Sequence, residues 1–205
     1  MRLIGLTGRS GCGKTTVGEL AKTMGFLVLD CDAIYKEITS RPGACLNAIR
    51  DTFGFETVRE GKLYRPALRE KVFSDQGEME KLNALTARYM GEEIRSRLAK
   101  ASEELVLLDA PTLFQSGMDQ KCDLIVGVLA SEEDCIRRIT ARDGISAADA
   151  ARRLAQQPSE EFYKKNCHVC LENRTDPVTF RRQAEQLLAS LKKGSFDCPK
   201  RDGVF

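Results

Sequence analysis

The chain has 205 residues, a length that suits one α/β domain with a substantial core. Its formal net charge is +2, from 32 Lys and Arg against 30 Asp and Glu, which gives no support for a nucleic acid or an acidic membrane as partner. No apolar run approaches the roughly 18 residues that cross a bilayer, and the eight cysteines are scattered, so we expect a cytoplasmic protein with reduced thiols.

The first predicted elements are a buried strand over residues 3–7 and a glycine-rich turn. Residues 8–15 read Gly-Arg-Ser-Gly-Cys-Gly-Lys-Thr, which matches GxxxxGK[ST] in full. In this motif backbone N–H groups surround phosphate oxygens, the lysine meets the β- and γ-phosphates, and the Thr15 hydroxyl can bind Mg²⁺. We expect ATP contacts from eight residues: Gly8, Ser10, Gly11, Cys12, Gly13, Lys14, Thr15 and Thr16.

A helix is predicted over residues 15–24, ended by Gly25, and a second buried strand over residues 26–29. Asp30 and Asp32 follow this strand, and at i and i+2 on a strand end their carboxylates would point to the same side. One could deprotonate an acceptor hydroxyl, and either could hold Mg²⁺ through water. The alternative is that Asp32 only caps a helix that starts at Ala33.

The stretch from residue 33 to about residue 100 is mostly helical and amphipathic, with breaks at Pro42, Gly54 and Gly61. It is too long for a simple crossover between parallel strands, so it predicts an inserted helical subdomain. Arg65 and Arg69 lie four residues apart within it. Such arginines can neutralise phosphate charge or lie on a solvated face.

Three more strands are predicted, over residues 105–108, 124–129 and 169–171, and a closing helix over residues 177–191. Ser131 is expected to cap a helix that carries Arg138 and Arg142. Cys167-His168-Val169-Cys170 lacks the second ligand pair of a structural zinc site, so we expect a short strand and no structural metal. The tail over residues 192–205 is polar.

Apolar strands that alternate with helices predict an α/β fold with a central parallel five-stranded sheet covered on both faces. With the phosphate-loop motif and the helical insertion, this indicates a three-layer P-loop NTPase fold. In such sheets ligands bind beyond the carboxyl ends of the strands. The loop over residues 8–15, the pair Asp30 and Asp32, and Asp109 all follow predicted strands and are therefore expected at that edge.

Several motifs together resemble the dephospho-CoA kinase family over about residues 1–191. Leu29-Asp30-Cys31-Asp32-Ala33-Ile34 is similar to its Asp-x-Asp segment, and residues 61–73 are similar to its Gly-x-Leu-x-Arg-x-x-Leu-x-x-x-Val-Phe pattern. Leu108-Asp109-Ala110-Pro111-Thr112-Leu113-Phe114 is similar to its Asp-x-Pro-Leu-Leu-Phe segment. Residues 138–157 resemble its lid, and Glu172-Asn173 stands where the family has Asp-Asn near the adenine.

The resemblance implies one kinase domain over residues 1–205, with an acceptor-binding insertion at about 36–100 and a lid at about 138–160. It implies that ATP, with Mg²⁺, phosphorylates the ribose 3′-hydroxyl of dephospho-CoA to give coenzyme A and ADP. Asp32 would be the base, while Lys14 and Arg142 would stabilise the transferred charge. Asn173 would lie near the adenine of ATP. The implied acceptor-binding set is Asp30, Asp32, Arg65, Asp109 and Pro111, and the implied metal-side groups are Thr15 and, through water, Asp30.

The chain departs from the family pattern at three places. Leu85-Thr86-Ala87-Arg88-Tyr89 lacks the family's His-Pro, Gln115 replaces a glutamate, and Cys167-His168 replaces Ala-Asp.

Two alternatives stay open from the residues alone: another P-loop kinase of nucleosides, nucleotides or other small molecules, and a nucleotide-dependent binding module. Lys14, Asp30 and Asp32 favour an enzyme, and we expect a monomer or weak homo-oligomer that binds neither nucleic acid nor a membrane.

Overall fold

The computed structural model describes residues 1–73 and 75–194. The chain forms two compact units, which we call the sheet unit (Met1–Leu29 and the chain from Glu103 onward) and the helical unit (Asp30–Ser102). Most of the predicted polar tail, with Cys198, lies outside the described residues. Within the described ranges, no helix is both long and apolar enough to span a membrane.

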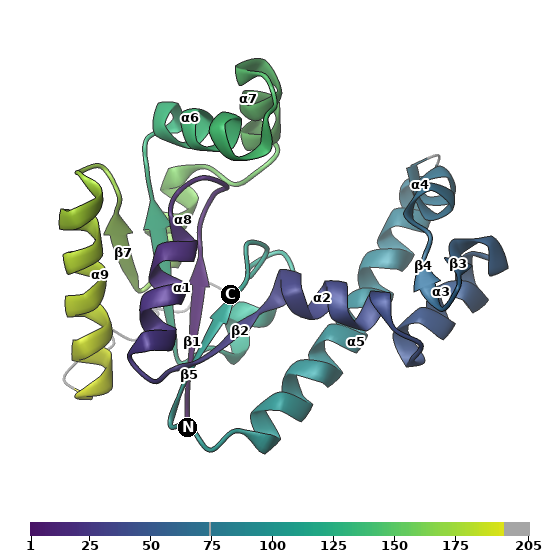
Figure 1. Ribbon diagram of the computed structural model, residues 1–205, viewed down its shortest axis with the longest axis horizontal. Helices are drawn as coiled ribbons and strands as arrows, with labels where there is room; N and C mark the ends of the chain where they lie inside the picture. Colours follow the sequence, from purple (N-terminus) through teal and green to yellow (C-terminus); the bar gives the residue numbers. More distant parts are fainter. Residues whose placement is uncertain (74, 195–205) are drawn as a thin grey trace. The chain divides into compact units, whose positions relative to one another are not determined.

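A central five-stranded sheet organises the sheet unit (Figure 1), in the order β2-β5-β1-β6-β7. Its strands are β1 (Arg2–Thr7), β2 (Leu27–Asp30), β5 (Leu105–Asp109), β6 (Leu124–Leu129) and β7 (Val169–Glu172). β1 pairs in parallel with β5 and β6, and β6 pairs in parallel with β7. The predicted parallel five-stranded α/β architecture is therefore confirmed.

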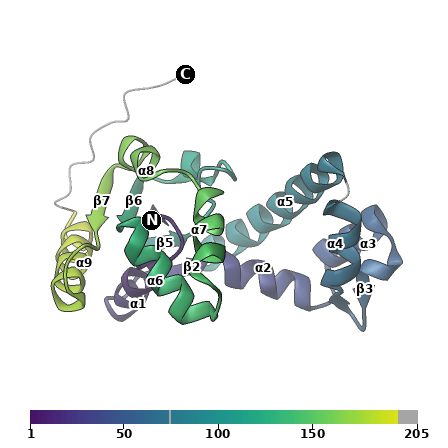
Figure 2. The same ribbon diagram turned by 90° about the horizontal axis from the view of Figure 1, so that it is seen from above.

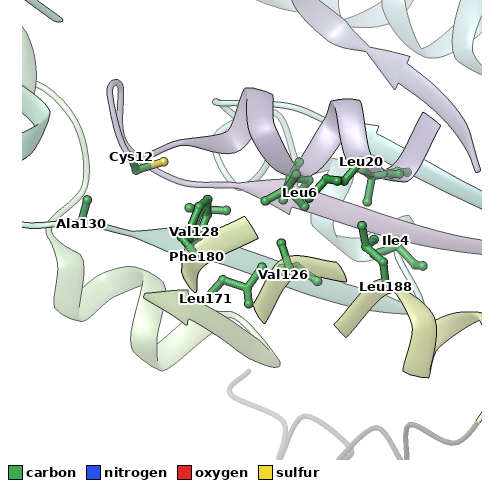
Figure 3. Packing of buried hydrophobic residues seen from close by; sticks show 14 of the residues in the cluster. Ile4, Leu6, Cys12, Leu20, Val126, Val128, Ala130, Leu171, Phe180 and Leu188 are labelled. Atoms are coloured by element: carbon green, nitrogen blue, oxygen red, sulfur yellow. The ribbon is translucent and has the colours of Figure 1, made fainter. Parts of the chain in front are cut away.

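Side chains that alternate along the strands cover both faces of this sheet. Ile4 and Leu6 are fully buried in the core with Phe180 (Figure 3). That core lies under helices α1 (Lys14–Thr23) and α9 (Pro177–Lys192), which pack against each other. On the opposite face, a Cβ at Gly5 would lie 2.7 Å from a methyl carbon of Leu113, so the turn after β5 covers the sheet there.

Three further helices follow β6: α6 (Glu132–Asp143), α7 (Ala147–Ala155) and α8 (Glu160–Asn166). The Ser131 hydroxyl accepts a hydrogen bond from Asp134 N at 3.1 Å, which confirms the predicted cap of α6. Gly144, with φ 67°, ends α6 in the left-handed conformation that glycine adopts at little cost. α6 packs on α7, and α8 packs on β6 and β7.

The helical unit contains α2 (Cys31–Ser40), α3 (Ala44–Phe53), α4 (Arg65–Phe73) and α5 (Gln76–Lys100). The long helix α5 contacts each of the other three (Figure 2). A short hairpin of β3 (Val58–Arg59) and β4 (Lys62–Leu63) interrupts the helices and was not predicted. Its turn holds Glu60 and Gly61 at φ 50° and 71°, the conformation of a two-residue hairpin.

Candidate active site

The loop between β1 and α1 has a shape that only glycines permit. Gly8, Gly11 and Gly13 adopt φ values of 145°, 77° and 108°. Added side chains would also collide, because a Cβ at Gly8 would lie 2.3 Å from Val128 O and one at Gly13 2.4 Å from Asn173 Nδ2. Gly13 makes no side-chain cap bond to α1, so the N–H groups of the first turn are suited to bind an anion at the helix start.

Lys14 folds back across this loop. Its Nζ donates to Gly8 O at 2.7 Å and to Arg9 O at 3.4 Å. The ammonium group is thereby held inside the curve of the loop, where it would meet a bound phosphate. Thr15 is exposed beside it at the start of α1, and Thr16 N donates to Gly13 O at 3.2 Å.

Two side chains from distant parts of the sequence support the loop carbonyls. Asn173, which is buried, donates from Nδ2 to Cys12 O at 2.9 Å. Arg138 Nη1 donates to Gly11 O at 3.1 Å, and Arg138 Nη2 donates to Asn173 Oδ1 at 3.4 Å. With their carbonyls fixed from behind, Gly11 and Cys12 present the opposite side of the backbone to a ligand.

A second support reaches the loop from the segment after α7. Gln157 Oε1 accepts from Ser10 N at 2.8 Å, and its Nε2 donates to Ser10 Oγ at 2.9 Å. Arg9 donates to Leu154 O at 3.1 Å and forms an ion pair with Glu132 at 3.2 Å. Sequence reasoning gave no role to Gln157 or to the Arg138 contact, although both stand in the segment that was singled out as a lid.

Cys12 supports the loop through its backbone carbonyl, and its Sγ also accepts a long 4.0 Å contact from Lys14 Nζ. Its side chain is fully buried among core residues (Figure 3). Burial raises the pKa of the Cys12 thiol, an effect that the neighbouring Lys14 charge opposes without cancelling. The thiol therefore stays protonated and acts as a small packing group.

Asp30 and Asp32 are arranged differently from the sequence prediction. Asp30 is the last residue of β2, but Asp32 already lies in the first turn of α2, so the strand-end geometry predicted for the pair is wrong. Asp30, not Asp32, caps the helix, because its Oδ1 accepts from Ala33 N at 3.0 Å. The capping explanation therefore does not apply to Asp32, whose carboxylate is exposed.

Asp109 is the last residue of β5, the strand that pairs with β1, and Pro111 lies two residues further on. Asp109 is in register with Leu6 and ends β5 at the carboxyl edge of the sheet. A Cβ at Gly18 would lie 3.8 Å from Asp109 Oδ2, so this carboxylate faces α1. Pro111 O accepts a long 3.5 Å hydrogen bond from Thr7 Oγ1.

Arg142 is engaged away from the loop. It donates to both oxygens of Asp143, at 2.7 and 2.9 Å, and Arg153 also binds Asp143 at 2.7 Å. The hydrogen bond from Arg142 lowers the pKa of Asp143, so the carboxylate is ionised at neutral pH. The predicted role of Arg142 in charge stabilisation stays a prediction.

Arg65 belongs to a cavity inside the helical unit. The cavity measures about 180 Å³ and is lined by Tyr35, Leu63, Arg65, Leu68, Arg69, Val72, Phe73, Met79 and Leu82. Burial raises the pKa of Tyr35, and the Arg65 charge partly opposes this. The walls thus combine apolar and aromatic surface with two guanidinium groups, a combination suited to an aromatic anion.

Replacing Asn173 tests its support of the loop. We expect Asn173→Ala to lower the free energy of unfolding by about 1–3 kcal/mol, because Cys12 O loses a buried donor. Thermal or urea denaturation measures this, with Asn83→Ala, at an exposed position on α5, as the matched control. Equal stability of the two variants would contradict the supporting role.

Comparison with known proteins agrees with this geometry. A family model described as Dephospho-CoA kinase matches residues 2–178. A Corynebacterium efficiens protein named "Dephospho-CoA kinase" is 33% identical over 195 residues, which cover 93% of this chain and 98% of that protein.

Two solved structures match the fold of this chain over most of its length. A crystal structure of a Thermus thermophilus protein matches with a TM-score of 0.80 and 31% identity, over 94% of this chain and 97% of that one. "Dephospho-CoA kinase from Campylobacter jejuni" matches with a TM-score of 0.71 and 22% identity, over 96% and 100% of the two chains, and supports the fold alone.

Proposed function

This chain belongs to the dephospho-CoA kinase family, and from that membership we propose how its residues divide the work of phosphoryl transfer. It is a kinase that uses ATP to phosphorylate dephospho-CoA at the ribose 3′-hydroxyl, which gives coenzyme A and ADP in the final step of coenzyme A biosynthesis. The match of the family model over residues 2–178, with the phosphate loop inside it, is the observation that carries this conclusion.

The loop over residues 8–15 is proposed to hold the triphosphate of ATP. Three left-handed glycines expose backbone N–H groups, and α1 adds the positive end of its dipole. Lys14 would exchange its bonds to Gly8 O and Arg9 O for phosphate oxygens. Asn173 holds the loop from behind, and a contact with the adenine is its second proposed role.

The oxygen groups beside the loop fit Mg²⁺, which prefers hydroxyl, carboxylate and water oxygens. The exposed hydroxyl residue Thr15 begins α1, and the Asp109 carboxylate faces the same helix. We assign Thr15 to direct ligation and Asp109 to a water-mediated contact. Asp30, the metal-side candidate from the sequence, already accepts the cap bond from Ala33 N. When bound, Mg²⁺ neutralises charge on the β- and γ-phosphate oxygens.

Asp32 is the proposed base. It is exposed, lies in the first turn of α2, and follows the strand that ends at the carboxyl edge of the sheet. Since Asp30 supplies the cap, the Asp32 carboxylate is available to accept the proton of the attacking hydroxyl. Arg142 is proposed to leave Asp143 and stabilise the transferred charge when substrates bind.

The cavity of the helical unit is the proposed acceptor region. Its Tyr35, Phe73 and Met79 offer surface for an apolar or aromatic part of dephospho-CoA, and Arg65 and Arg69 offer charge for its phosphates. The other acceptor candidates are proposed only on the family resemblance: Asp30, Asp32, Asp109 and Pro111.

Removing Arg65 tests this assignment. We expect Arg65→Ala to raise KM for dephospho-CoA about tenfold or more, because a charge-assisted contact worth about 1.5–3 kcal/mol is lost. KM for ATP should stay unchanged. Arg50→Ala is the matched control, since Arg50 is an exposed arginine of the same unit that pairs with Asp51. An unchanged KM for dephospho-CoA would remove Arg65 from the acceptor site.

The activity itself is tested by coupled detection of ADP release. MgATP is supplied with dephospho-CoA or, in parallel, with a panel of nucleosides, nucleoside monophosphates and small hydroxy acids. We expect turnover with dephospho-CoA and none with the panel. No ADP release with dephospho-CoA in a folded preparation would contradict the function, and release with a panel member would favour another small-molecule kinase.

The proposed cytoplasmic location is supported by the substrates and by the cysteine thiols. Seven cysteines among the described residues are outside any disulfide, which suits the reducing cytoplasm that also supplies MgATP. We propose a monomer or weak homo-oligomer whose partners are ATP and dephospho-CoA.

A further inference from the structure

Two cysteines that the kinase reaction does not use meet at one point of the sheet. Cys167 and Cys170 come from the end of α8 and from the edge strand β7. A Cβ at Gly127 of β6 would lie 2.8 Å from Cys167 Sγ and 3.4 Å from Cys170 Sγ. Both sulfur atoms therefore occupy one small space, which the absence of a side chain at residue 127 leaves open.

Backbone pairing at His168 produces this convergence. His168 N donates to Ile125 O at 2.9 Å, and His168 Nδ1 accepts from Ile125 N at 2.9 Å. Cys167 N donates to Tyr163 O at 2.8 Å, and Cys170 stands in register with Gly127. The chain bends at His168, so the two cysteine side chains lie on one face although two residues lie between them in the sequence.

These two thiols are also more accessible than the buried cysteines of the described chain. Cys167 and Cys170 are partly exposed, whereas Cys12, Cys45 and Cys135 are buried. Burial raises the pKa of Cys45 and of Cys135 to about 11, which keeps them unreactive. A hydrogen bond from Cys167 lowers the pKa of Cys170, which favours its thiolate.

We propose that Cys167 and Cys170 form a reversible disulfide site that exchanges with low-molecular-weight disulfides. The Cys170 thiolate attacks one sulfur of the small disulfide, forms a mixed disulfide and releases the first small thiolate. Cys167 then loses its proton and attacks Cys170 Sγ, which breaks the mixed bond and expels the second thiolate. Two protein thiols are oxidised, and one small disulfide is reduced to two thiols. In the described part of the chain no cluster of three metal-binding side chains competes with this chemistry.

The proposed site is linked to the phosphate loop through β7. The register that pairs Cys170 with Gly127 also pairs Glu172 with Leu129, and Asn173 N then donates to Leu129 O at 2.7 Å. Asn173 Nδ2 binds Cys12 O in the loop. A bond between the sulfurs ties Cys170, at the start of β7, to Cys167, and we infer that the oxidised protein binds ATP more weakly than the reduced protein.

Mass spectrometry of the intact, folded protein tests the site. Full-length protein is treated with oxidised glutathione, alkylated with iodoacetamide and digested with trypsin, which releases residues 166–174 as one peptide that contains both cysteines. After the oxidant treatment we expect this peptide to be unalkylated and two hydrogen atoms lighter than the same peptide with two free thiols. When the oxidised protein is reduced with dithiothreitol before alkylation, we expect both cysteines to be alkylated. Alkylation of both cysteines after the oxidant treatment would overturn the proposal, and so would a stable glutathione adduct on Cys170 without ring closure.

Cysteine variants distinguish a disulfide between Cys167 and Cys170 from oxidation elsewhere in the chain. Cys170→Ser and Cys167→Ser should each abolish closure while circular dichroism shows a folded protein. Cys122→Ser, at another partly exposed cysteine of the sheet unit, should close normally and serves as the matched control. Direct titration of MgATP should give a higher Kd for the oxidised wild type, with no change on oxidation of Cys170→Ser. An unchanged Kd in protein that contains the disulfide would overturn the link to the loop.

Discussion

Lys14→Ala is expected to lose turnover by about a hundred- to a thousandfold, because the loop then has no cation for the β- and γ-phosphates. The Nζ group lies 2.7 Å from Gly8 O, within the curve of the loop, so no large movement is needed for it to reach a phosphate. Steady-state ADP release measures kcat and KM, and calorimetry measures binding of MgATP. Both kcat and ATP affinity should fall.

Lys22→Ala is the matched control for this prediction. Lys22 is an exposed lysine in the last turn of the same helix, α1, so its removal changes net charge equally and leaves the loop intact. We expect near wild-type kinetics. Unchanged ATP binding by Lys14→Ala would contradict the assignment of the loop, whatever the acceptor.

Asp32→Asn should lower kcat by about 10²–10⁴-fold, the usual contribution of a general base. The substitution keeps size and shape but removes the proton acceptor. Since Asp32 does not cap α2, stability should be unchanged within about 0.5 kcal/mol, as is usual for exposed positions. Binding of MgATP should also be retained.

Two controls separate the base role from simple loss of charge. Asp51→Asn removes another exposed carboxylate of the helical unit and should leave kcat unaltered. Asp30→Ala should act mainly on stability, since it removes the oxygen that accepts the cap bond from Ala33 N. Full turnover by a folded Asp32→Asn enzyme would exclude Asp32 as the base.

Much of the sheet unit could be predicted from the sequence because its signals are local. A short apolar strand, a glycine that ends a helix and the Ser131 cap can each be recognised from a few neighbouring residues. The five strands of the central sheet lie where the sequence predicts them. The phosphate loop was likewise readable, because its glycines and Lys14 stand at fixed spacing.

The rest depended on contacts that local patterns do not contain. The end of β2 was misjudged because α2 begins directly at Cys31, so Asp32 follows a helical rather than an extended geometry. The hairpin at Glu60 and Gly61 was missed because each of its strands has only two residues. Arg138 and Gln157 contact the loop through tertiary packing, and no motif or residue spacing in the sequence predicts these contacts.

The supports of the phosphate loop have a consequence for how the protein is made. The loop is synthesised before its supports, because Arg138, Gln157 and Asn173 contact it across sequence separations of 127, 147 and 161 residues. Long-range contacts of this kind form late, since chain closure must precede them. A nascent chain truncated before residue 173 carries the whole motif yet lacks the side chain that holds Cys12 O. We therefore expect full affinity for nucleotide only after Asn173 has been synthesised and has packed against the loop.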